Sequence, residues 1–175
     1  MIVVSDTTPL ISLMKADSLE LLKGLFHEVL IPKAVYEELT TNPAFRDEAE
    51  QIRNSEFIKV VSVKEPKIVE IIRCTSGLDL GESEAIAYAD QEKADALLMD
   101  EAKGRQVANS LGIHIMGTIG IFLFAYEEKL ITASDVGIAF EKLKQANRHI
   151  GRDLMNYALD IINQKTNNQG GSRSG

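Results

Sequence analysis

The sequence predicts an α/β fold, in which a central, mostly parallel sheet of four to five strands lies between two layers of helices. Short apolar runs rich in β-branched residues alternate along the chain with longer segments of helical periodicity, which is typical of parallel sheets. The chain has 175 residues, of which 45% are hydrophobic, and this is enough for one domain with a substantial core.

The first half of the chain begins with an apolar strand at 2–6. The run at 29–31 is a strand or an extended connector, because it is short and β-branched, and Pro32 then suits the first turn of a helix that reaches Thr41. The other elements expected here are helices at 8–15, 17–25, 46–54 and 66–74 and a strand at 58–63.

The second half continues the alternation after a Thr-Ser-Gly loop at 75–77. We expect strands at 96–99 and 113–116 and helices at 81–92, 101–111, 118–128, 133–146 and 151–163. Residues 1–130 are predicted to form the main domain, and residues 131–163 form helices packed on that domain. The polar, Gly- and Ser-rich segment at 164–175 is predicted to be a disordered tail, whose end resembles an artificial linker.

Composition excludes several classes of protein. The net charge of −7 argues against a protein that coats polyanions, but it does not exclude a nuclease, because acids that hold divalent cations lower the net charge. The single cysteine, Cys74, fits a reducing cytoplasm. No apolar run approaches the roughly 18 residues that span a bilayer, so we expect no membrane partner.

Two acids follow predicted strands. Asp6 ends the first strand and Asp100 follows the strand at 96–99, and each precedes a helix. Because parallel strands end at the same edge of a sheet, where ligands bind, both carboxylates are predicted to converge there. The alternative is that each aspartate only caps the helix that follows it.

Helical geometry selects one acid in the helix that starts near residue 81. Glu82 shares the apolar stripe with Ala85, Ile86 and Ala89, whereas Glu84 lies about 200° from that stripe and is expected to meet solvent. The alternative for Glu82 is a capping box with Asp79.

The helix that ends at Thr41 poses the same choice. Val35 and Leu39 mark its buried side, Glu37 lies about 200° from each of them, and Glu38 is their neighbour. Glu38 is therefore the inward candidate, and a solvated helix face is its alternative.

Taken together, four segments resemble the PIN domains, a ribonuclease-like fold that includes the toxin ribonucleases of toxin–antitoxin pairs. The segments read Asp-Thr-Thr-Pro-Leu after the first strand, Val-Tyr-Glu-Glu-Leu, Gly-Glu-Ser-Glu-Ala-Ile-Ala and Leu-Leu-Met-Asp-Glu-Ala-Lys-Gly-Arg. The resemblance covers about residues 1–130. It implies a three-layer PIN-like fold, an Mg- or Mn-dependent endoribonuclease acting on RNA, a homo-oligomer such as a dimer, and an antitoxin protein as a partner.

The resemblance also implies roles for individual residues. The implied catalytic acids are Asp6, Glu38, Glu82 and Asp100, and the implied metal ligands are Asp6, Asp100, Glu82 and Glu101. Thr8 and Thr118 match supporting hydroxyl positions. One departure is Glu82, which stands where the family usually has Asp and leaves Glu84 as an alternative third acid.

Carboxylate oxygens without nitrogen ligands suit hard cations such as Mg²⁺ or Mn²⁺. Lys103 and Arg105 follow Asp100 closely and are the first candidates to hold the RNA backbone; Arg148 and Arg152 are the second, and a solvated helix face is the alternative. The competing hypothesis is an inactive PIN-like binding module that uses the same edge of the sheet. A phosphotransferase is less well supported, and no Gly-x-Gly-x-x-Gly follows the first strand to suggest a dinucleotide site.

Overall fold

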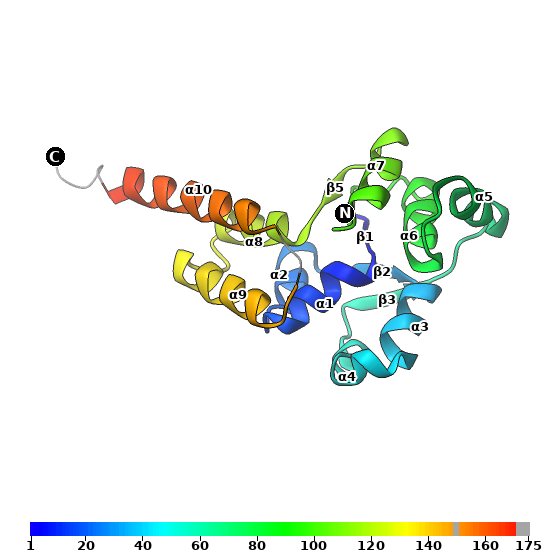
Figure 1. The fold of residues 1–175 in the computed structure, drawn as a ribbon, viewed down its shortest axis with the longest axis horizontal. Coiled ribbons are helices and arrows are strands. Elements are labelled where there is room, and N and C mark those ends of the chain that lie inside the picture. The colour runs from blue at the N-terminus through cyan, green and yellow to red at the C-terminus, as the bar shows by residue number, and fades with distance from the viewer. Residues whose placement is uncertain (149–150, 171–175) are drawn as a thin grey trace.

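The computed structural model describes the backbone of residues 1–148 and 151–170. Within these ranges five strands form one sheet in the order β3-β2-β1-β4-β5, and every neighbouring pair is parallel. The strands are β1 (Val3–Ser5), β2 (Val29–Pro32), β3 (Ile58–Val61), β4 (Ala96–Leu98) and β5 (Ile115–Met116). The predicted α/β fold is confirmed, with an all-parallel sheet (Figure 1).

Helices connect and flank the strands. They are α1 (Thr7–Lys15), α2 (Leu21–Phe26), α3 (Lys33–Thr41), the 3-10 turn η1 (Pro43–Phe45), α4 (Arg46–Asn54), α5 (Pro66–Ser76), α6 (Leu80–Gln91), α7 (Ala102–Ser110), α8 (Thr118–Glu127), α9 (Ala133–Gln145) and α10 (Arg152–Gly170). Residues 164–170, expected to be disordered, are therefore helical, and the rest of that predicted tail lies outside the described residues. None of the described helices is long and apolar enough to cross a membrane.

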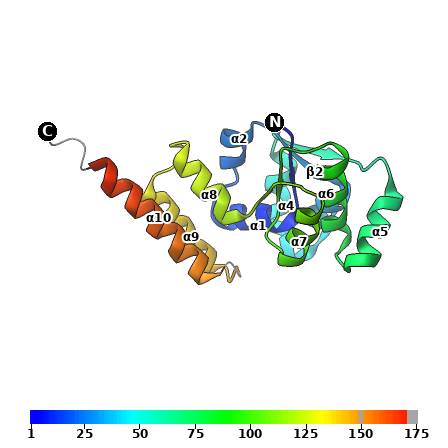
Figure 2. The ribbon, with the colours of Figure 1, turned by 90° about the horizontal axis from the view of Figure 1, so that it is seen from above.

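Neighbouring residues of β1 place their side chains on opposite faces of the sheet, because the side chains of a strand alternate. Val3 belongs to a core with Leu10 of α1 and Phe122 of α8. Val4 belongs to a second core with Ile86 of α6 and residues of α5 and α7. The sheet thus lies between two helical layers, with α5, α6 and α7 on one side (Figure 2).

The carboxyl ends of the two central strands lie level with each other. Ser5 is paired with Leu98, and the backbone N–H of Asp6 donates to the Leu98 carbonyl over 3.0 Å. Helix α1 begins directly after Asp6, and Asp100 lies two residues beyond Leu98. The predicted convergence of the two strand ends at one edge is therefore present.

Candidate functional site

Asp6 is the most buried acid at this edge, with 2% of its surface exposed. The pKa of its carboxyl is raised to about 7, chiefly by burial and in smaller part by the charges of Glu82 and Asp79. The backbone N–H groups of Thr7 and Thr8 oppose this shift, although the Asp6 side chain accepts no capping hydrogen bond of normal geometry. Capping of α1 therefore does not explain why an aspartate is buried here.

Glu82 and Asp79 form a capping box at the start of α6. The Glu82 N–H donates to Asp79 Oδ1 over 2.8 Å, and the Asp79 N–H donates to Glu82 Oε2 over 2.9 Å. Burial raises the pKa of Glu82, and the charges of Asp79, Glu101 and Glu38 raise it further, against the Asp79 amide, which lowers it. The helix-capping alternative for Glu82 is thus correct. The same side chain also belongs to a group of interacting acids, here called the acid cluster, which consists of Asp6, Glu38, Asp79, Glu82 and Glu101.

Glu38 faces this cluster from α3 and is half-buried. The hydroxyl of Thr7 donates to Glu38 Oε2 over 2.6 Å, which joins the start of α1 to α3. Glu38 and Asp79 both lie close to Gly81, because a methyl group there would be 3.5 Å from Glu38 Oε2 and 3.6 Å from Asp79 Oδ1. The inward orientation predicted for Glu38 is therefore present.

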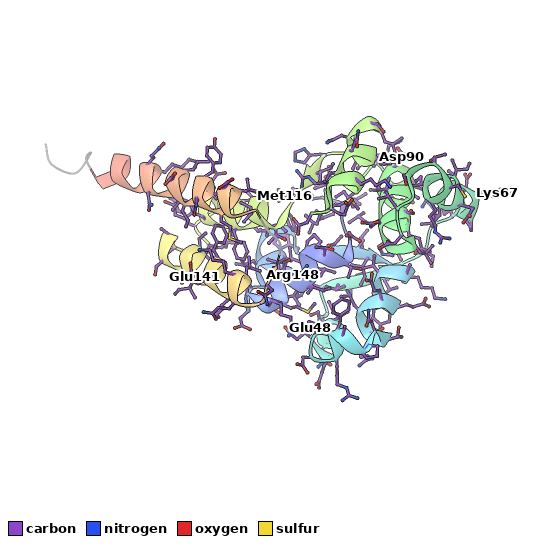
Figure 3. All side chains as sticks on the ribbon, in the orientation of Figure 1. Glu48, Lys67, Asp90, Met116, Glu141 and Arg148 are labelled. Carbon is purple, nitrogen blue, oxygen red and sulfur yellow. The ribbon has the colours of Figure 1, made fainter. Side chains whose placement is uncertain are left out.

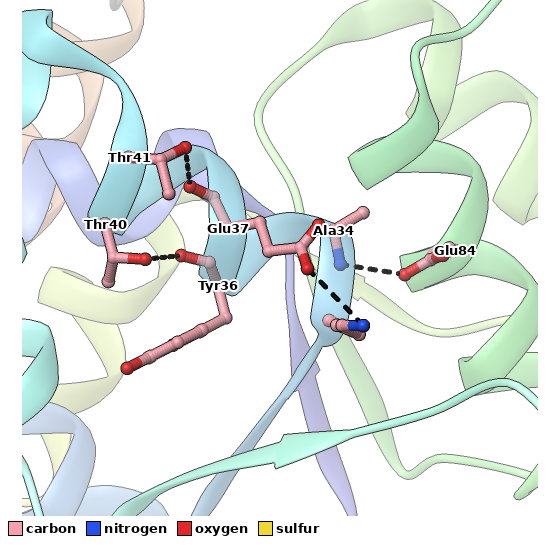
Figure 4. A network of polar contacts seen from close by, with 7 residues as sticks. Ala34, Tyr36, Glu37, Thr40, Thr41 and Glu84 are labelled. Carbon is pink, nitrogen blue, oxygen red and sulfur yellow. Dashed lines mark hydrogen bonds and ion pairs between the residues drawn. The ribbon is translucent and has the colours of Figure 1, made fainter.

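The expectation that Glu84 meets solvent was wrong. Glu84 is half-buried, and its Oε2 accepts a hydrogen bond of 3.0 Å from the Ala34 N–H in the first turn of α3 (Figure 4). A carboxylate at a helix N-terminus satisfies a free N–H and interacts well with the helix dipole. Helical geometry correctly placed Glu84 away from the apolar stripe of α6. The expectation of solvent failed because α3 packs against that side of α6. Glu37, by contrast, is exposed and pairs with Lys33 on its own helix.

Asp100 is held by Thr118 at the start of α8. The Thr118 N–H donates to Asp100 Oδ1 over 2.7 Å, and the Thr118 hydroxyl donates to Asp100 Oδ2 over 2.5 Å. Gly117 leaves room for this carboxylate, because a methyl group there would lie only 2.9 Å from Asp100 Oδ1. Asp100 does not cap α7; Glu101 does, by accepting a 2.6 Å hydrogen bond from the Gly104 N–H.

The two side chains predicted to bind RNA, Lys103 and Arg105, differ in exposure and in hydrogen bonding. Lys103 is exposed, and its Nζ would lie 3.2 Å from a methyl group on Gly77, in the loop before α6. Arg105 is half-buried and donates to the Met99 carbonyl over 2.9 Å, so its predicted contact with RNA would use the rest of its guanidinium.

Arg148 reaches the start of α1 from the segment that follows α9. Arg148, which is labelled in Figure 3, donates to the Ser12 hydroxyl over 3.2 Å and to the Thr8 carbonyl over 3.4 Å. Thr8, the predicted supporting residue, therefore contacts this arginine through its backbone. The side chain of Arg152 lies outside the described residues.

The predicted acids come together in part. Asp6 interacts with Glu82, which in turn interacts with Glu38 and Glu101. Asp100 lies at the same edge of the sheet but is bound to Thr118. Among the described residues no three His, Cys, Asp or Glu side chains are grouped closely enough to form a complete metal site.

Two observations fit a hard cation at this edge. The donors are all carboxylate oxygens, which is the set that Mg²⁺ and Mn²⁺ prefer. In addition, Ser83 Oγ, directly after Glu82, is the buried side-chain polar atom that lacks a hydrogen bond in the described structure. An unpaired buried hydroxyl is unusual, and its oxygen is a donor of the kind that a hard cation accepts.

Sequence reasoning missed two members of the site. Asp79 was considered only as a helix cap, yet its charge raises the pKa of both Asp6 and Glu82. Thr7 was passed over, although it binds Glu38. The available signal for Thr7 was its position in the first helical turn directly after a strand-end aspartate, where a hydroxyl lies at the edge of the sheet.

Comparison with known proteins identifies the family of the chain. A family model described as a PIN domain matches residues 2–164, which includes all five strands and most of α10. No curated protein matches the chain.

Proposed function

Because the chain belongs to the PIN-domain family, whose members are usually nucleases, we propose that it is a divalent-metal-dependent ribonuclease that hydrolyses RNA phosphodiester bonds. The observation that carries the proposal is Asp6. The Asp6 carboxyl is almost fully buried, accepts no capping hydrogen bond of normal geometry from α1 and has a pKa raised to about 7. In a purely structural role such a carboxyl would lower the stability of the folded protein. A cation beside it would stabilise its charged form.

PIN domains generally use divalent metals, and the oxygen donors here suit Mg²⁺ or Mn²⁺. We assign the ligands to Asp6, Glu82, Asp100 and Glu101, with Glu38 as a further catalytic acid. A cation held there would supply an activated water and neutralise charge on the scissile phosphate.

The chain's own residues orient these acids. Thr7 fixes one oxygen of Glu38, and Thr118 fixes both oxygens of Asp100. Lys103 forms no ion pair within the described part of the chain, so its ammonium is available to hold a phosphate of the RNA backbone beside the loop before α6. Arg148 positions the first turn of α1 through the Thr8 carbonyl.

The experiment is cleavage of single-stranded RNA by the purified protein with Mn²⁺. Wild-type protein is expected to cleave, and Asp6→Asn is expected to abolish cleavage while circular dichroism stays unchanged. Glu37→Gln is the matched control, because Glu37 is exposed and faces away from the cluster. Equal cleavage by wild type and Asp6→Asn would indicate a contaminating nuclease and refute the proposal.

PIN domains often pair with antitoxins. We therefore include in the proposal that the protein is the toxin of a toxin–antitoxin pair and that it forms a dimer. Induced expression should arrest growth with wild type and not with Asp6→Asn, and sedimentation should give twice the chain mass. Normal growth under wild-type expression would contradict the toxin role, and a monomer in sedimentation would contradict the dimer.

The second candidate function is an inactive PIN-like module that binds a partner. It is favoured by the separation of the acids, which do not form a complete metal site in the described structure. Wild-type protein that neither cleaves RNA nor binds Mn²⁺ would support this function over the first.

A further inference from the structure

A groove of about 450 Å³ opens beside Asp100, on the side of the sheet where β5 forms the edge. Asp100 and Arg105 lie at its sheet end, and Met116, Ile119 and Leu123 supply apolar walls from β5 and α8. Its volume falls within the roughly 300–1,000 Å³ of pockets that hold small organic groups. The groove is therefore continuous with the proposed active site and large enough for part of a substrate.

Helix α10 forms the opposite wall of the groove. Met155, Ala158 and Ile162 face the core, whereas Tyr157 is 63% exposed and Leu154 is 51% exposed. Tyr157 lines the groove, so its ring is open to a ligand there. Tyr157 and Arg105 line the same groove, and proteins that bind single strands combine exposed aromatic rings with basic side chains to hold bases and backbone.

We propose that this groove receives an unpaired base of the RNA next to the bond that is cut, stacked on Tyr157. The inference rests on the proposed ribonuclease function, because Asp100 joins the groove to the acid cluster. Stacking on a side chain requires an unstacked base, so the proposal makes the protein selective for single-stranded RNA. Stacking alone discriminates weakly among bases, so no strong sequence preference follows from Tyr157.

A base fits these walls better than a protein segment does. The guanidinium of Arg105 can attract a phosphate at the sheet end of the groove, and the exposed ring of Tyr157 offers a surface on which a base can stack. Occupation of the groove by a second copy of the chain or by a partner protein is an alternative outcome of the test below.

The test measures binding of a fluorescein-labelled single-stranded oligoribonucleotide to full-length Asp6→Asn protein in EDTA, by fluorescence anisotropy. Adding Tyr157→Ala should raise the Kd about 5- to 100-fold, the range expected for loss of one stacking ring. Tyr157→Phe should keep the Kd within about twofold, because the ring remains. Ile138→Ala is the matched control, since Ile138 is 54% exposed on α9 and lines a different groove.

An unchanged Kd for Tyr157→Ala, or no measurable binding of RNA by the parent, would overturn the proposal. A double-stranded RNA that showed the same dependence on Tyr157 would also overturn it. A parent that sediments as a dimer, and is made monomeric by Tyr157→Ala, would assign the groove to a second copy instead. Tyr157-dependent binding without cleavage by the wild type would support base binding in the groove, but it would refute the nuclease activity and with it the placement of that base next to a cleaved bond.

Discussion

At the scale of single residues, the buried Asp6 carboxyl lowers the stability of the folded protein whenever it is ionised. Its carboxyl is buried among Glu82 and Asp79, and its pKa lies near 7 instead of at its ordinary value of 3.8. The folded protein therefore holds the Asp6 proton more tightly than the unfolded chain does. Stability from this group is present below pH 3.8 and is lost as pH rises through 7.

The first prediction concerns this pH dependence in metal-free buffer. Asp6→Asn, whose amide cannot ionise, should be more stable than wild type above pH 7, by as much as about 4 kcal/mol. The difference should shrink toward zero as pH falls to 3.8. Urea unfolding of both proteins across this range measures it, and a constant difference would show that Asp6 does not titrate in this window.

Gly117 is the second residue whose neighbours set a clear expectation. A methyl group there would lie 2.9 Å from Asp100 Oδ1 and 3.0 Å from a nitrogen of Arg105, so Asp100 must move. Gly117→Ala should reduce RNA cleavage by up to about 100-fold, because small displacements of a catalytic group are costly.

Gly137→Ala is the control for that substitution. A methyl group on Gly137 in α9 would meet nothing within 4 Å, so this variant should keep full activity. It should also gain about 0.5–1 kcal/mol in the free energy of unfolding, since alanine favours a helix interior. Equal activity of the two variants would show that the position of Asp100 is not critical.

At the scale of elements, the site depends on how α3 and α6 meet. Glu84 of α6 binds the Ala34 N–H of α3, and Glu38 of α3 approaches Gly81 of α6. The contact between Glu84 and Ala34 therefore fixes the distance between the two helices that carry Glu38 and Glu82.

The third prediction tests this contact. Glu84→Ala should lower the free energy of unfolding by about 0.5–2 kcal/mol, as does loss of a helix cap. Glu37→Ala should cost less than about 0.5 kcal/mol, because its ion pair with Lys33 is exposed. Urea unfolding at neutral pH compares them, and equal losses would argue against a cap by Glu84.

The sequence predicted the elements more completely than the contacts between them. The alternation of strands and helices placed Asp6 and Asp100 at strand ends, and helical periodicity distinguished Glu38 from Glu37. The bond from Glu84 to α3 could not be predicted, because it depends on the packing of two helices about 50 residues apart in the chain. The helical residues 164–170 were missed because their polar composition resembles that of disordered tails.

At the scale of the whole molecule, α9 and α10 share the core that supports the sheet. Phe140 of α9 packs edge-on against Phe122 of α8, with ring centroids 5.6 Å apart, and both rings are fully buried. Met155 of α10 lies in the same core. These helices also bring Arg148 to α1 and Tyr157 to the groove beside Asp100.

The fourth prediction is that these helices unfold together with the sheet. Phe140→Ala should lower the free energy of unfolding by about 3–5 kcal/mol, the usual loss for a buried phenylalanine. Unfolding followed by circular dichroism should remain a single transition. A separate early transition would show that residues after 130 form an independent unit.

The central claim is that Asp6 anchors a cation site. Calorimetric titration with Mn²⁺ of wild type, Asp6→Asn and the exposed control Glu37→Gln tests it most directly. We predict that wild type and Glu37→Gln bind Mn²⁺ and that Asp6→Asn does not, with all three folded. Equal Mn²⁺ binding by Asp6→Asn, or no binding by wild type at millimolar metal, would contradict the claim.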